Sequence, residues 1–179
     1  MRRNLGIASI VVALCLVPLI LLAETVIITK SRLISVTPTV SASPDYAAGD
    51  AVGGLQTIAG AAMPEVGSGI VHTVTVANLA AVSTPLDVII FSSNPTGTTV
   101  TDNAALDIAD ADLPKVACVI QVSGSSSLAD NYLSFTTGAN CVFKLAQQQT
   151  SLYAIAVARA AINLDSTSDL TFRYGILQD

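Results

Sequence analysis

The stretch that decides the fold class is SGIVHTVTVAN, residues 68–78. Apolar and hydroxyl-bearing side chains alternate along it with a period of two, which is typical of a β-strand with two different faces. The alternation predicts that His72 lies on the more apolar face with Ile70, Val74 and Val76. Because His72 is the single histidine and has no cysteine close to it in sequence, we expect a packed or interface residue rather than a ligand or general base.

Similar short runs continue on both sides of this segment and are separated by Gly, Pro, Ser, Asn and Asp. We expect turns at 92–97, 123–127, 136–140 and 163–169. Eight or nine strands at this spacing, with no long helical pattern, predict an all-β antiparallel sandwich or jelly roll. The further expected strands are 33–40, 55–62, 86–91, 115–122, 132–137, 141–146, 151–160 and 169–177.

One segment, TDNAALDIADADLPK at 101–115, has a different pattern. It predicts a short helix near 104–109 that is capped at Asp102 or Asn103 and turns Leu106 and Ile108 inward. Its acidic residues do not have EF-hand spacing, so we expect a solvated helix start rather than a cation site. These residues are Asp102, Asp107, Asp110 and Asp112.

The glycine-rich stretch PDYAAGDAVGG, residues 44–54, matches neither dinucleotide-binding nor P-loop spacing and contains no lysine. We therefore interpret Gly49, Gly53 and Gly54 as turn and bulge positions. Tyr46 and Asp50 are expected to lie on the surface and to contact a neighbouring subunit.

The composition argues against several classes of function. The chain has one histidine and no GxSxG motif, so it has few groups for nucleophilic catalysis. Four Tyr and four Phe are few aromatic residues for binding sugars, which argues against a glycosidase. We therefore expect no enzyme and assign no catalytic, cofactor-binding or metal-binding residue. Residues 33–179 hold four basic and twelve acidic residues, a net charge of −8, which disfavours direct nucleic-acid binding. The three cysteines are expected to be small buried hydrophobes, although Cys118 and Cys141 could form a bridge in an exported chain.

The sequence divides into an apolar N-terminal segment, 1–32, and a single β-domain, 33–179. Residues 5–23 are uncharged and long enough, as a helix, to span a bilayer. Two arginines precede this run, as in a signal peptide. A membrane anchor, a cleaved signal and a misassigned start all remain open, although no methionine lies between Met1 and Met63 to serve as a later start.

Three blocks of the chain resemble small virion proteins of tailed bacteriophages: SVTPTVSASPDYAAGDAVGGLQTIAGA (35–61), SSNPTGTTVTDNAALDIADADLPK (92–115) and TSLYAIAVARAAINLDSTSDLTFRYGILQD (150–179). The resemblance implies a β-sandwich head decoration or minor capsid protein. It also implies a homo-oligomer, for example a trimer, that contacts the major capsid protein. A tail or head–tail joining component, and a membrane-anchored or exported β-sandwich binding module, are the alternatives.

Overall fold

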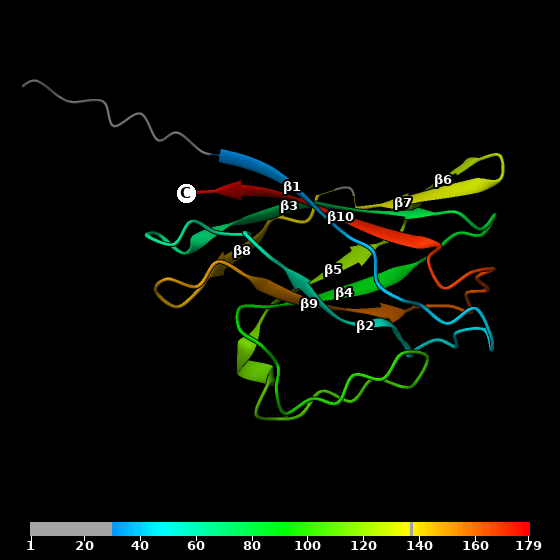
Figure 1. Cartoon of the computed structure of the whole chain (residues 1–179), viewed down its shortest axis with the longest axis horizontal. Coiled ribbons are helices and arrows are strands. Elements are labelled where there is room, and N and C mark those ends of the chain that lie inside the picture. The colour runs from blue at the N-terminus through cyan, green and yellow to red at the C-terminus, as the bar shows by residue number, and fades with distance from the viewer. Residues whose placement is uncertain (1–29, 137) are drawn as a thin grey trace, which may run out of the picture.

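The computed structural model describes residues 30–136 and 138–179, which form two antiparallel β-sheets packed face to face (Figure 1). This architecture confirms the predicted all-β antiparallel sandwich. The larger sheet has the order β1-β10-β3-β7-β6 with β8 also paired to β3, and the smaller sheet has the order β2-β9-β4-β5. The larger sheet consists of β1 (Lys30–Val36), β10 (Leu170–Gln178), β3 (Ser68–Asn78), β7 (Asn131–Phe135), β6 (Gly124–Leu128) and β8 (Cys141–Lys144); the smaller consists of β2 (Ala51–Ile58), β9 (Leu152–Ala158), β4 (Leu86–Phe91) and β5 (Val116–Val122).

The strand pairs are nested in chain order. Strand β1 pairs with β10, β2 with β9, β3 with β8 and β4 with β5. This rolled-up arrangement across two sheets is that of a jelly roll. The hairpin β6–β7 is inserted between β5 and β8 and pairs with the other half of β3.

Strand β6 corrects the predicted turn at 123–127. Serine and glycine have low β-propensity, so the sequence GSSSL carries little strand signal. A two-residue turn at Ala129 and Asp130, in which Ala129 has a φ of 62°, nevertheless joins β6 to β7 and allows the two strands to pair along their length. The pairing supplied by β7 therefore outweighs the local preference.

Strand β3 contains a bulge that overturns the predicted position of His72. Val71 and Val74 are both fully buried, so two residues rather than one lie between successive inward side chains. On the neighbouring strand the register shifts between Gly175 and Ile176, opposite this point. His72 is consequently exposed and does not lie on the apolar face of the strand.

The main core fills the space between the sheets and contains a buried pair of polar side chains, Tyr174 and Gln56. The hydroxyl of Tyr174 donates to Oε1 of Gln56 at 2.7 Å, and both side chains are buried. Burial raises the pKa of Tyr174 far above its usual range. The Nε2 atom of Gln56 has no hydrogen-bond partner, so this pair is only partly satisfied.

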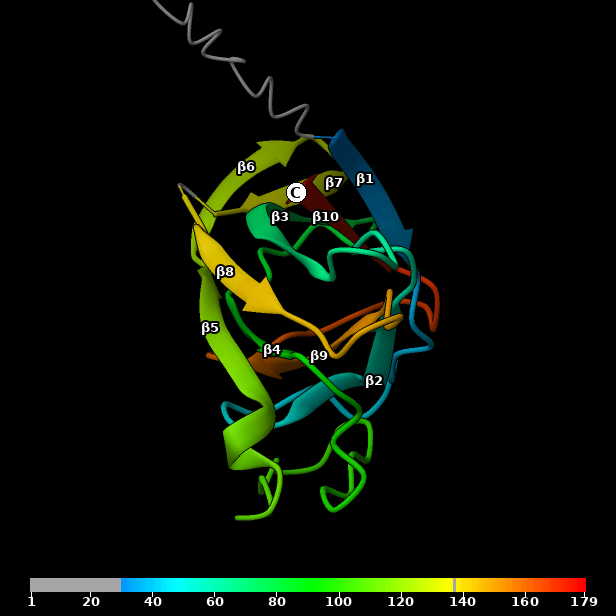
Figure 2. The same cartoon turned by 90° about the vertical axis from the view of Figure 1, so that its left-hand side faces the viewer.

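The sandwich has two open sides, one at β5 and β8 and the other at β1 and β2 (Figure 2), and different contacts close them. On one side, a disulfide between Cys118 of β5 and Cys141 of β8 joins the two sheets. The expectation of unpaired buried cysteines was therefore wrong for these two residues, while Cys15 lies outside the described residues. On the other side, the carbonyl of Gly60, just after β2, accepts from Arg32 of β1 at 3.1 Å and from Gln178 of β10 at 2.7 Å.

The glycines of the 44–54 stretch take the backbone roles expected of them. Gly53 and Gly54 have φ values of 74° and 68°, and the register of β2 against β9 shifts between Val52 and Leu55. A Cβ atom on Gly53 would approach the ring of Pro38 to 2.6 Å. This segment is therefore a bulge at a close approach of two chain segments.

The loop from 92 to 112 covers the outer face of the smaller sheet and contains no helix at 104–109 (Figure 1). Its backbone bonds to the region around β2 instead: the Ala51 amide donates to Ala104 at 2.9 Å, and the Leu106 amide donates to Gly49 at 3.1 Å. These tertiary bonds replace the internal bonds that a helix needs. Leu106 and Ile108 do turn inward as expected, against a cluster that includes Phe91 and Ile155.

The one helical element among the described residues is a 3-10 turn at Leu113–Lys115. Among residues 30–136 and 138–179, no helix has the length and apolar character needed to cross a membrane. The predicted membrane segment, 5–23, lies outside the described residues. Lys30 to Arg32, which were expected to belong to the apolar N-terminal segment, are part of β1.

Candidate functional site

Asp112 is one of two carboxylates that hold the 92–112 loop in place. Its buried side chain accepts from Lys115 at 2.7 Å and from the Thr98 hydroxyl at 2.8 Å. The Lys115 ammonium is the main cause that lowers the Asp112 pKa below its ordinary value of 3.8, and Thr98 lowers it further. Asp112 thus has a structural role that leaves it no free oxygen facing solvent.

Asp102 is the second carboxylate, and its partner corrects the prediction for Tyr46. The Tyr46 side chain is 1% exposed, donates to Asp102 at 2.7 Å and accepts from the Ser41 amide at 2.6 Å. Burial raises the pKa of Tyr46 above its usual range, and Asp102 raises it further. Asp50 accepts from the amide of Ala47, three residues earlier, at 2.7 Å. The contact made by Tyr46 lies inside one subunit, so this residue cannot contact a neighbour as predicted.

The other two aspartates of the loop, Asp107 and Asp110, are exposed. Asp107 borders a hollow of about 410 Å³ whose other lining residues are small or hydroxyl-bearing. In the part of the chain that the structure describes, no three His, Cys, Asp or Glu side chains come close enough together to hold a metal ion.

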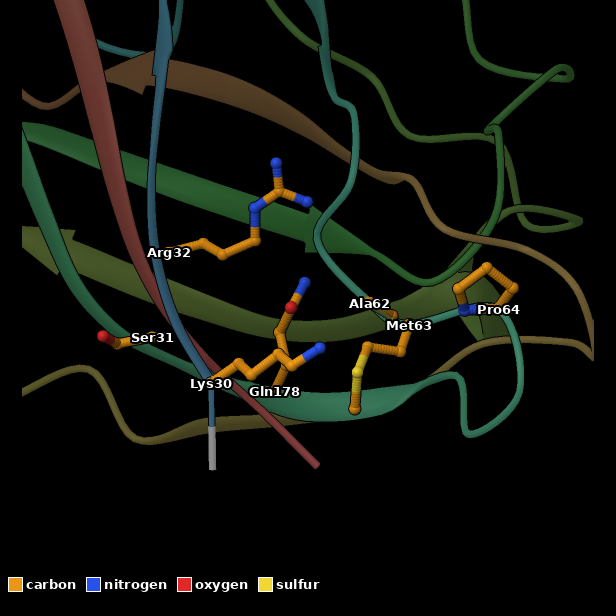
Figure 3. A pocket seen from close by; sticks show the side chains of 7 residues that line it. All are labelled: Lys30, Ser31, Arg32, Ala62, Met63, Pro64 and Gln178. Carbon is orange, nitrogen blue, oxygen red and sulfur yellow. The ribbon is translucent and has the colours of Figure 1, made fainter. Parts of the chain in front are cut away.

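A hollow of about 520 Å³ lies at the side of the sandwich closed by Gly60 (Figure 3). Lys30, Arg32 and Gln178 line it on one side, and Met63 and Pro64 line it on the other. The Arg32 and Gln178 side chains are already bound to the Gly60 carbonyl, so they brace this side of the sandwich. Lys30 is exposed at the mouth of the hollow.

The outer face of the larger sheet is the most distinctive surface of the described chain. In β8, Cys141 and Phe143 are buried toward the core, so Val142 between them points outward and is 70% exposed. The same alternation directs other apolar side chains outward, and Leu177, Ile70 and Val142 are direct neighbours across three strands. We call this surface the open face; its apolar members are Leu33, Ile70, Leu128, Leu133, Phe135, Val142 and Leu177.

A hollow of about 270 Å³ marks the β-bulge on the open face. Gly175 forms its floor, with Leu33 opposite it on β1 and Thr73 opposite it on β3. Leu177 and the exposed His72 also line this hollow. The Thr73 hydroxyl lies over Gly175, since a Cβ atom there would clash with it, so both apolar and polar groups wall this hollow.

Charge is distributed unequally between this face and the rest of the molecule. The six strands of the larger sheet contain no Asp or Glu, and of their four cations Lys144 and Arg173 point to the open face, whereas Lys30 and Arg32 lie on the other side of the sheet. Both ion pairs of the described residues lie elsewhere, at Lys115 with Asp112 and at Arg159 with Asp87. The strands that form the open face thus carry no carboxylate, and Asp179, directly after β10, accepts from the Ser68 hydroxyl at 2.7 Å at the edge of this face.

The open face could not be recognised in the sequence, because its members come from six strands whose order was unknown. The one available signal was the lack of acidic residues in segments such as 68–78 and 170–178. Comparison of the chain with family models, with curated proteins and with solved structures finds no match.

Proposed function

We propose that the chain is a structural protein of a phage virion, either a head decoration (cement) protein or a minor capsid protein, and that it acts by burying surface rather than by catalysis. The observation that carries this proposal is the open face. It carries outward apolar side chains on six strands, mixed with hydroxyl-bearing ones, and is uncovered within residues 30–136 and 138–179, whereas the outer face of the smaller sheet is packed under the chain's own loop. Contiguous exposed apolar patches of this kind mark interaction surfaces.

Three further observations support the proposal. The jelly roll is an architecture found in viral capsid domains, although an architecture alone does not imply a function. The sequence blocks 35–61, 92–115 and 150–179 resemble virion proteins of tailed phages. The Cys118–Cys141 bridge is compatible with a virion surface, because disulfides persist outside the reducing cytoplasm.

The proposed partners are further copies of the chain, for example in a trimer, and the major capsid protein. Quantitative mass spectrometry of purified particles tests this directly. We expect peptides from residues 33–179 at a stoichiometry tied to the number of capsid subunits. Particles that are infectious and fully assembled but lack these peptides would overturn the proposal.

A second candidate is a membrane-anchored or exported β-sandwich binding module. The disulfide favours it, because a bridge between the two sheets forms readily in an oxidising compartment. Fractionation of cells that express the full chain separates this candidate from the first. Recovery of the protein in the membrane or periplasmic fraction supports export, and a wholly cytoplasmic, unprocessed chain contradicts it.

A further inference from the structure

We propose that the open face docks on a different protein, whose contact surface is apolar and carries a carboxylate that pairs with Arg173. This inference rests on the proposed function, in which the partner is the shell protein beneath the decoration protein. It adds which face is turned toward that partner and what chemistry the partner surface must have.

The apolar part of the argument comes from exposure. Val142 and Leu33 are 70% and 68% exposed, the highest values among the large apolar side chains of the described residues. They lie on β8 and β1, on opposite flanks of β3 and β10. The chain thus covers the outer face of one sheet with its own loop and leaves an apolar surface that spans the other sheet.

The hollow lined by Gly175 is a place on the open face where a side chain of the partner can bind. It is lined by Leu33 and Leu177, with Thr73 and His72 at its polar side. Interfaces gain most of their affinity from a few side chains seated in such pockets near the centre of the contact. We infer that one apolar side chain of the partner occupies this hollow.

The charged part of the argument concerns Arg173. It points outward between the buried Phe172 and Tyr174, and its cross-strand neighbours are Ser35 and Thr75. Among the described residues it has no ion-pair partner, and the strands around it contain no acidic residue. A docked partner would desolvate this guanidinium, so the partner must supply a carboxylate.

The same charge pattern argues against a contact between two open faces. Such a dimer would bury Arg173 of both copies, and the carboxylate at the edge of this face, that of Asp179, already accepts from Ser68 beside Lys144. Burying cations without a counter-charge is strongly unfavourable. A heterologous partner with an acidic and apolar surface fits the observations better than a second copy does.

The experiment uses phage particles produced with full-length variants of the chain. Leu33→Asp places a charge beside the Gly175 hollow, and Arg173→Glu reverses the central charge. The matched controls are Leu113→Asp, which alters a leucine that is 53% exposed in the 3-10 turn, and Arg173→Lys, which keeps the charge. Urea unfolding of each variant checks that its stability stays within about 1 kcal/mol of the wild type, as expected for surface changes.

We expect Leu33→Asp and Arg173→Glu to lower the number of copies per particle by roughly tenfold or more, while both controls load as the wild type does. Equal loading of all four variants would overturn the docking face while leaving the proposed function intact. Absence of the wild type itself from particles would overturn the proposed function and, with it, the partner named here.

Two other outcomes would also overturn the inference. In one, the wild type forms an oligomer in solution that Leu33→Asp dissociates and Leu113→Asp does not, which would make the open face a self-interface. In the other, the wild type binds vesicles of phosphatidylserine and phosphatidylcholine, and Arg173→Glu abolishes that binding. This result would assign the face to an anionic membrane instead.

Discussion

Reduction of the Cys118–Cys141 bridge should lower the free energy of unfolding by about 3 kcal/mol. The two cysteines are 23 residues apart in sequence, and closing a loop of this length reduces the entropy of the unfolded chain by an amount worth about 3.4 kcal/mol at 25 °C. Both thiols remain in the reduced protein, and Cys141 is buried, so reduction removes the cross-link while retaining the packed sulfur atoms. The difference between the oxidised and reduced protein therefore measures the cross-link itself.

Urea unfolding followed by far-UV circular dichroism, with and without a reductant, is the suitable assay, because the chain contains no tryptophan. Free energies rather than midpoints must be compared, since a cross-linked unfolded state is more compact and has a smaller m-value. Thiol titration of the unfolded full chain provides the control: one reactive thiol, that of Cys15, is expected before reduction and three after it.

The double variant Cys118→Ala, Cys141→Ala should lose the cross-link and, in addition, the packing of the sulfur atoms, so its loss should exceed that of the reduced wild type by about 1 kcal/mol. A difference below about 1 kcal/mol between oxidised and reduced wild type, with oxidation verified by the thiol count, would refute the reasoning. It would mean that the two sheets are held equally well without the bridge.

Three further predictions concern the interior and the loop. Gly53→Ala should lower the free energy of unfolding by about 2 kcal/mol or more, since it combines a positive φ with a clash against the ring of Pro38. Gly54→Ala should cost only the backbone strain of about 1 kcal/mol, because no atom lies near its added Cβ. Equal losses for the two variants would contradict the clash. Tyr174→Phe should lower the free energy of unfolding by about 1–3 kcal/mol, because it leaves the buried side-chain amide of Gln56 without any hydrogen-bond partner. Adding Gln56→Leu should recover part of that loss. If it recovers none, the buried pair is not the cause of the loss. The pKa of Asp112 lies below its ordinary value of 3.8, so the ionised side chain stabilises the fold above pH 3.8 and this contribution is lost as the pH falls through the lowered pKa. Asp112→Asn should remove this part of the acid dependence of the free energy of unfolding. An unchanged acid profile would disprove the assignment.

The strands were the most predictable part of the fold. Segments such as 68–78 and 86–91 combine β-branched residues with clear boundaries, and both are strands over those residues. Strand β6 was missed because its serines carry no strand signal until β7 is placed beside them. The helix expected at 104–109 was wrong because the backbone of that segment bonds to Gly49 and Ala51, which are distant in sequence.

The candidate site was less predictable than the fold, and the reasons are physical. The side on which His72 lies depends on a bulge, and the bulge becomes recognisable only when Gly175 of another strand is placed opposite β3. Tyr46 was expected on the surface because it lies among glycines, but its hydroxyl reaches Asp102, which is 56 residues away in sequence. The open face depends on sheet order, which alternation within a single strand does not determine.

The unequal closure of the two sides of the sandwich has a consequence for how the molecule opens. A covalent bond holds β5 to β8, whereas on the opposite side the side-chain bonds from Arg32 and Gln178 to the Gly60 carbonyl are non-covalent. The two sheets should therefore stay joined at the disulfide and separate first at the opposite side. Partial unfolding should begin where β1 and β2 meet. Amide protons near Gly60 should exchange with solvent sooner than those beside Cys118 and Cys141, and reduction of the bridge should remove that difference.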